Sequence, residues 1–386
     1  MDHTHYSMLM DAVVDVPDPR KPRGKRHPWA LLLTLIAAAL VCGQRSGRAI
    51  GQWVDEHALE LMTQLPIPQR PLPSPSTLRR ALQAIDVAAL ETRITHFVHS
   101  LDLANPPAPT AGLWHGQAVD GKAVRGANRH GAQVHLVSLV HHGSARVRKQ
   151  VRVRDKSNEI TAVPVLLADL DLHGTVTTMD SLLCQQAIAQ QIVAQHGHYL
   201  MVVKENQPAL FAAIDLVFRC PPPPQTTDYV QAFTTANKGH GRLETRTLER
   251  TAALTGHLDW PGVGQVLRRT CQRINRTTGA ISEKVTYGVT SLAPGEASAE
   301  ELEALWRRVP TCGCWGIENK VHYVRDETLG EDRGQMYRGQ APQALAALRN
   351  GILSLLRSHG VTQIADALRH HGASVHAALA LIGVPL

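Results

Sequence analysis

Three acidic residues lie where their carboxylates are able to hold metal ions. Asp120 follows a short apolar segment in VDGKAVRG, and Asp180 follows another in TVTTMDS, so each is predicted to stand at the end of a strand. Strand ends of an open α/β sheet border the crevice in which such proteins place their sites. Glu318 lies in WGIENKVHYVRD, which is predicted to be helical. Three carboxylates from distant parts of a chain are what a pair of hard divalent cations requires.

Each of these acids also has a plain structural interpretation. An Asp before Gly is often a turn residue, and Asp180 is placed to cap the helix that follows it. Glu318 shares one face of its predicted helix with His322 and Arg325, at i, i+4 and i+7, but it is equally consistent with a solvated position. Rival third acids follow a short way downstream, at Asp326, Glu331 and Asp332.

The elements expected to position the acids form a mixed α/β sheet. Strands in a meander are followed by alternating helices and strands, and a β-rich insertion is expected at about 221–295. The remaining predicted elements are a hairpin of 134–142 and 145–153, a helix of 158–170 capped by Asn158, a strand of 175–180, a helix of 182–196 and a strand of 198–204. Helices resume at about 298.

The first hundred residues are predicted to be helical and to form a separate domain. The apolar run from Trp29 to Cys42 spans 14 residues, fewer than the roughly 20 that a membrane span needs, so a buried helix is expected. A further helix is expected after Ser76, which is placed to cap it. The proline-rich stretch ANPPAPTAG (104–112) is predicted to be the linker.

Composition and charge favour a polyanionic partner. The chain has 386 residues with 40 Lys and Arg against 33 Asp and Glu, a net charge of +7. Two runs, 20–26 and 145–154, each hold five basic residues, suited either to phosphate contact or to a solvated face. In the second run the arginines at even positions are predicted to share one face of a strand, namely Arg146, Arg148, Arg152 and Arg154.

Cysteine usage and the N-terminus indicate a cytoplasmic protein. Six cysteines are too sparse for a disulfide scaffold, and no export signal or membrane span is expected. Cys312, Cys314 and His322 are suited to half of a zinc site, but the sequence offers no obvious second half.

The motifs VDGKAVRG, KSNEIT, TTMDSLLCQ, VVKENQPAL, HGRLETR and CWGIENKVHYVRDETLGED occur in this order. Together with VPDPRKPRGKRHPW and PSPSTLRRAL near the N-terminus, they resemble the ISAs-type, or H-repeat-associated, DDE transposases of bacterial insertion sequences. The resemblance extends from about 14 to 357. It departs from the family pattern at Cys314, Tyr323 and Leu329, where His, Trp and Phe are usual; the three acids themselves are retained.

The resemblance implies a ribonuclease-H-like catalytic domain at 107–386, with the β-rich insertion inside it, preceded by a helical, DNA-binding domain at 1–106. It maps the catalytic, metal-binding acids onto Asp120, Asp180 and Glu318, which would hold two Mg²⁺ or Mn²⁺ ions. The implied activity is cleavage and strand transfer of double-stranded DNA at the ends of an insertion sequence, by a homodimer or larger assembly. The alternatives are a nuclease of the same fold without strand transfer and a catalytically degenerate DNA-binding protein.

Further polar residues near these motifs are candidate DNA contacts. For each of them an ordinary surface position is an equally good interpretation. They are Lys122, Arg125, Lys156, Lys204, Asn206, Gln207, His240, Arg242, Arg246 and Arg325.

Overall fold

The structure is a computed structural model of the chain. It describes residues 8–23, 25–65, 67, 71–129, 132–153, 158–226, 229–239, 241–307 and 317–385. They divide into two compact units: the first comprises 1–107, 121–157 and 318–386, and the second comprises 108–120 and 158–317.

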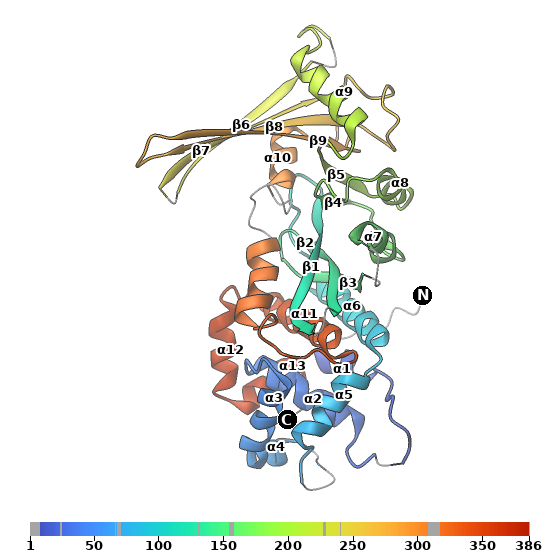
Figure 1. The fold of residues 1–386 in the computed structure, drawn as a ribbon, viewed down its shortest axis with the longest axis vertical. Helices are drawn as coiled ribbons and strands as arrows, with labels where there is room; N and C mark the ends of the chain where they lie inside the picture. Colours follow the sequence, from blue (N-terminus) through green and yellow to red (C-terminus); the bar gives the residue numbers. More distant parts are fainter. Residues whose placement is uncertain are drawn as a thin grey trace. The chain divides into compact units, whose positions relative to one another are not determined.

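Five strands form a sheet in the order β3-β2-β1-β4-β5 (Figure 1). They are β1 (His115–Arg129), β2 (Ala132–His141), β3 (Val147–Arg152), β4 (Thr175–Met179) and β5 (His198–Val203). β4 is parallel to both β1 and β5, whereas β2 and β3 form an antiparallel hairpin. Three strands in a meander followed by two parallel strands on the far side of the first make a ribonuclease-H-like sheet. The predicted fold class is therefore confirmed.

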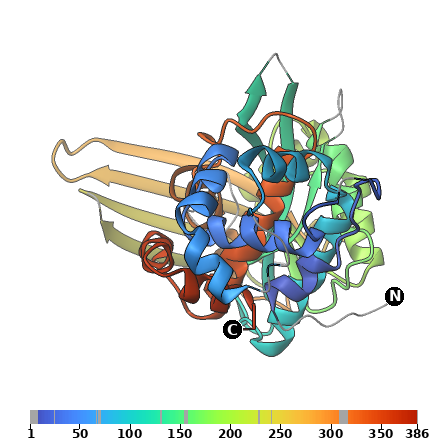
Figure 2. The ribbon, with the colours of Figure 1, turned by 90° about the horizontal axis from the view of Figure 1, so that it is seen from below.

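The β-rich insertion extends this sheet rather than forming one of its own. Its strands are β6 (Gln231–Gly239), β7 (Arg242–Thr251), β8 (Gln265–Asn275) and β9 (Ile281–Thr290). β9 pairs antiparallel with β5, so the order continues as β5-β9-β8-β7-β6. Figures 1 and 2 show the four strands side by side as two long hairpins. The turn predicted at RTTG joins β8 to β9.

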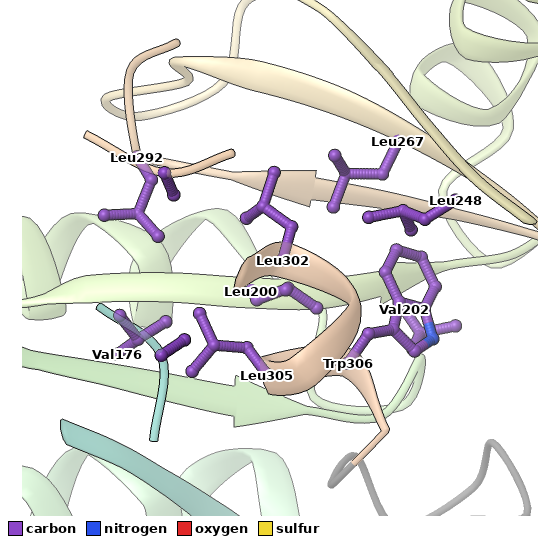
Figure 3. Packing of buried hydrophobic residues seen from close by; sticks show 11 residues of the cluster. Val176, Leu200, Val202, Leu248, Leu267, Leu292, Leu302, Leu305 and Trp306 are labelled. Carbon is purple, nitrogen blue, oxygen red and sulfur yellow. The ribbon is translucent and has the colours of Figure 1, made fainter. Parts of the chain in front are cut away.

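Helices cover the parallel part of the sheet and the root of the insertion. They are α7 (Glu159–Leu167), α8 (Gln186–Ala194), α9 (Pro208–Arg219) and α10 (Ala299–Trp306). Trp306, which is fully buried, packs with Leu248 and Val202 (Figure 3). A Cβ on Gly288 of β9 would meet the Trp306 ring at 2.3 Å, so only glycine lets the ring lie flat on this strand. This core joins α10 to strands from both halves of the sheet.

The first unit gathers helices from both ends of the chain. The N-terminal ones are α1 (Leu9–Val14), α2 (Trp29–Val41), α3 (Gly47–Glu56), α4 (Ala58–Gln64), α5 (Pro75–Ala84) and α6 (Val87–Ala104), and the C-terminal ones are α11 (Ala341–Ser358), α12 (Ile364–Gly372) and α13 (Val375–Ile382). α11 packs against α1, α2, α5 and α6, and nearly all of its side chains are buried. The N-terminal helices thus share one core with the C-terminal helices, and the domain division at 106/107 stays a proposal.

A hydrogen-bonded carboxyl joins α6, β3 and α11 inside this core. Glu91 of α6 accepts hydrogen bonds from Gln150 Nε2 and Gln343 Nε2, each at 2.9 Å. Burial raises the pKa of Glu91 to about 7, because the two amide donors only partly replace the hydration of a charged carboxylate. The acid is therefore protonated in the folded state below neutral pH.

This carboxyl should make stability fall as the pH rises. A raised pKa means that Glu91 contributes fully below its unfolded value of 4.5 and that the contribution is lost as pH passes about 7. Relative to Glu91→Gln, the wild type should lose about 3 kcal/mol of unfolding free energy between pH 5 and pH 8. Urea unfolding at both values measures the difference. The exposed Glu60→Gln is the control, and an equal pH dependence of wild type and Glu91→Gln would contradict the assignment.

Candidate active site

Asp120 and Asp180 stand at the same level of two neighbouring parallel strands. β1 and β4 pair from His115 opposite Thr175 to Ala118 opposite Thr178. The same register continued brings Asp120 level with Asp180, which directly follows the last residue of β4. Asp180 thus stands at a strand end as predicted, but Asp120 does not, because β1 continues past it to Arg129. Neighbouring strands lie about 4.8 Å apart, so carboxylates on such positions are close enough to share a cation.

The main chain after β4 orients the Asp180 side chain. Its Oδ1 accepts a hydrogen bond from the backbone N–H of Leu183 at 3.2 Å. Burial raises the pKa of this carboxyl, and the negative charge of Glu159, at the start of α7, raises it further, whereas Leu183, Leu182 and Lys204 act in the opposite sense. A half-buried carboxyl beside another acid resists ionisation unless a cation is bound nearby.

The turn that carries Asp180 is braced by two amides at the end of β5. Asn206 Nδ2 donates to the carbonyl oxygen of Ser181 at 2.7 Å, and Gln207 Nε2 donates to that of Cys184 at 2.9 Å. Both residues were expected to contact DNA; in the structure their amides hydrogen-bond to the turn. The sequence placed them at a strand end but gave no sign of the carbonyls they meet. Lys204, just before them, is exposed.

Glu318 begins a π-helical segment, η2 (Glu318–His322), which is followed by a second, η3 (Val324–Thr328). Its side chain lies outside the part of the chain that the structure describes. The segment is helical as predicted, but its turns are π-helical, and these wider turns change which residues share a face with Glu318. π-Helical turns recur at functional sites.

The three rival acids are all engaged in ion pairs. Lys122, on β1 and only 8% exposed, pairs with Asp326 and lies 3.7 Å from Asp332 Oδ1. Glu331 is 1% exposed and is paired with Arg325 at 2.7 Å and with Arg349 at 3.4 Å. Because their charges are already balanced by cationic side chains, these acids are poor candidates for binding a metal ion.

These pairs also correct two expected DNA contacts. Arg325 is fully buried and donates to Glu331, so its guanidinium is not presented to a phosphate. Lys122 likewise faces carboxylates from the segment around η3. The sequence showed the charges but not the partners, which lie far along the chain from Lys122.

Two family models match successive parts of the chain. A family model described as "DDE_Tnp_1-associated" matches residues 10–98, and one described as "Transposase DDE domain" matches residues 107–355. The chain belongs to the DDE transposase family.

Its relatives carry the names that the resemblance implied. "Putative transposase YncI" of Escherichia coli O157:H7 is 28% identical over 359 residues, which cover 90% of this chain and 87% of that protein. "H repeat-associated putative transposase YhhI" of Escherichia coli (strain K12) is 25% identical over 367 residues, covering 92% and 91%. A solved piggyBac transposase synaptic complex with hairpin DNA has a TM-score of 0.45 and 9% identity, covering 96% of this chain and 76% of that one.

The other candidate DNA contacts of this DDE transposase differ in exposure. The Arg125 side chain is 81% exposed, and Arg242 is 38% exposed, whereas Arg246 is largely buried and pairs with Glu244 at 2.8 Å. Lys156 and His240 lie outside the described residues. Arg125, Arg242 and Lys204 are therefore the exposed basic candidates among the described residues.

The two basic runs are partly neutralised. Arg20 and Lys25 both pair with Asp18, at 2.8 and 2.9 Å. In the second run, Arg146 does not share an exposed face with its neighbours: it is 4% exposed and pairs with Asp102 at 2.7 Å. Arg154 lies outside the described residues. The predicted basic face is thus smaller than its sequence suggests.

Neither a metal-binding cluster nor a membrane-spanning helix is found in the described part of the chain. Among the described residues, which do not include the Glu318 side chain, no cluster of three His, Cys, Asp or Glu side chains is arranged to hold a metal ion. Cys312 and Cys314 lie outside the described residues, so the zinc alternative is untested. No helix in the described part of this transposase is both long and apolar enough to cross a membrane.

Proposed function

We propose that this DDE transposase binds the ends of an insertion sequence and catalyses metal-dependent cleavage and strand transfer of double-stranded DNA. The observation that carries the proposal is the level placement of Asp120, within β1, and Asp180, directly after β4, on two neighbouring parallel strands of a ribonuclease-H-like sheet. Family membership supports the reaction class.

The residues at this level of the two strands fit a hard divalent cation. Asp120 and Asp180 supply oxygen donors, and the half-buried Asp180, near the acid Glu159, is a carboxyl whose ionised form a cation would stabilise. We propose Glu318 as the third ligand, because its downstream rivals Asp326 and Glu331 are already neutralised by basic side chains. When bound, two Mg²⁺ or Mn²⁺ ions would activate the attacking oxygen and stabilise the leaving one.

The remaining residues have supporting tasks. Asn206 and Gln207 hold the turn that aims Asp180, so the carboxylate keeps its direction as the cation site fills. Arg125 and Arg242 are proposed to contact phosphates, together with Lys156, Lys204 and His240. Such contacts would give binding that weakens steeply with salt. Joining two DNA ends to one target also favours at least a homodimer.

Cleavage of a duplex carrying the terminal repeats tests the proposal. We expect nicking that needs Mg²⁺ or Mn²⁺ and exposes a 3′-hydroxyl, followed by joining of that 3′ end to target DNA. Nicking without joining would reduce the function to that of a nuclease. Binding without nicking at any metal concentration would favour a degenerate DNA-binding protein and would overturn the catalytic proposal.

A further inference from the structure

Lys122 is a buried cation placed just beyond the first catalytic acid. It lies on β1, on the same strand as Asp120, and is 8% exposed. A buried ammonium is costly unless it is paired, and here it is paired with Asp326 of η3 and lies 3.7 Å from Asp332. The lysine therefore joins β1 to the segment that starts with Glu318.

The main chains of β1 and this segment also meet directly. The backbone N–H of Arg125 donates to Asp332 Oδ1 at 3.2 Å. At Gly126 an added Cβ would lie 2.5 Å from the carbonyl oxygen of Glu331, a contact that side chains do not make. Only glycine permits this approach. The motif VDGKAVRG therefore contacts the segment in three ways: through the Lys122 ion pair, through the Arg125 amide and through the close approach at Gly126.

The opposite side of the same segment is held by α11. Glu331 accepts a hydrogen bond from Arg325 Nε at 3.0 Å and pairs with Arg349 of α11 at 3.4 Å. Arg349 also donates to the carbonyl oxygen of Arg45 at 3.1 Å. With α11 fixing one side, Lys122 is the buried side chain that ties the other side to β1, and the exposed Arg125 side chain adds a longer pair with Asp332 at 3.9 Å.

We propose that Lys122 is a positioning residue, which fixes the Glu318-bearing segment to β1, the strand that carries Asp120 two residues earlier. This inference rests on the proposed function for its catalytic consequence but not for its structural one. Lys122 does not act as a phosphate contact, because it would have to leave two carboxylates and an almost fully buried position to reach DNA.

The structural consequence is tested by hydrogen exchange, without DNA or metal. In Lys122→Met, the amides of 318–332 should exchange at least about tenfold faster, because the segment then opens locally at lower cost. Asp326→Asn should have the same effect, and Asp332→Asn, which removes the longer pair, a smaller one. The matched control is Arg369→Met, which removes an exposed ion pair with Asp366 in the same unit. Unchanged exchange in Lys122→Met and Asp326→Asn would overturn the proposal.

The catalytic consequence is tested by separating turnover from DNA binding. Lys122→Met and Asp326→Asn should both lower kcat for nicking, and leave the Kd for DNA and its salt dependence unchanged. The charge-swapped pair, Lys122→Asp with Asp326→Lys, should recover part of the lost kcat. If Lys122→Met instead weakens DNA binding and lowers the salt slope by about one while Asp326→Asn does neither, Lys122 contacts phosphate and the proposal fails. A wild type that does not nick DNA would contradict the proposed function. The hydrogen-exchange measurement would still test whether Lys122 positions the segment.

Discussion

Replacing Asp120, Asp180 or Glu318 by Ala should each reduce DNA nicking by on the order of 10³-fold or more, since each removes a ligand of ions that stabilise the transition state by several kcal/mol. DNA affinity in metal-free buffer should change little. Without metal the carboxylates repel phosphate, so removing one should leave the DNA affinity unchanged or slightly higher. Single-turnover nicking and DNA titration on the same preparations measure the two quantities.

The exposed Asp171→Ala is the matched control for loss of an acid from the same unit as Asp180. It should nick as the wild type does. Normal nicking by Glu318→Ala would show that a different residue supplies the third carboxylate. Loss of DNA binding in all three variants, in place of loss of nicking, would mean that the acids support the fold and not the reaction.

Replacing Glu331 by Gln should destabilise the protein by about 3–5 kcal/mol, because two buried arginines lose their shared counter-charge. Arg325 and Glu331 are 0% and 1% exposed, so solvent has little means of compensating. Arg349 would then keep no ion pair among the described side chains. It would keep its hydrogen bond to the carbonyl oxygen of Arg45. Urea unfolding followed by tryptophan fluorescence gives the free energy.

The neighbouring Glu327→Gln provides the control for this loss. Glu327 pairs with Arg333 on the surface, where the two side chains are 45% and 65% exposed, so its removal should cost less than about 1 kcal/mol. A cost for Glu331→Gln as small as that of Glu327→Gln would contradict the view that this buried network holds the η3 segment.

Local patterns were enough to find the strands that carry Asp120 and Asp180 and the strand end at Asp180, but they did not show that β1 continues past Asp120 to Arg129. The apolar run before Asp180, the N-cap at Asn158 and the turn between β8 and β9 each depend on a few neighbouring residues. The side-chain cap of α5 is a near miss: Ser74 accepts from Thr77 N, two residues before the serine that was expected to do so. Parallel pairing then follows from the alternation of helices and strands.

Partnerships across the chain could not be predicted in the same way. Lys122 and Arg325 were interpreted as DNA contacts because the sequence displays a charge but not the carboxylate that neutralises it. Arg146 was placed on an exposed face for the same reason, although Asp102 lies beside it. The π-helical turns after Glu318 were not predicted, and the contacts that hold this segment come from β1 and α11, which lie outside it.

Anomalous diffraction from crystals of the protein bound to Mn²⁺ and cleaved terminal-repeat DNA is the most direct measurement of the central claim. The account predicts manganese peaks beside Asp120 of β1 and beyond the end of β4, with carboxylate oxygens of Asp120, Asp180 and Glu318 as ligands at about 2.0–2.3 Å. Manganese held by Asp326 or Asp332, or a Glu318 carboxylate that stays away from ions bound by the two aspartates, would contradict it.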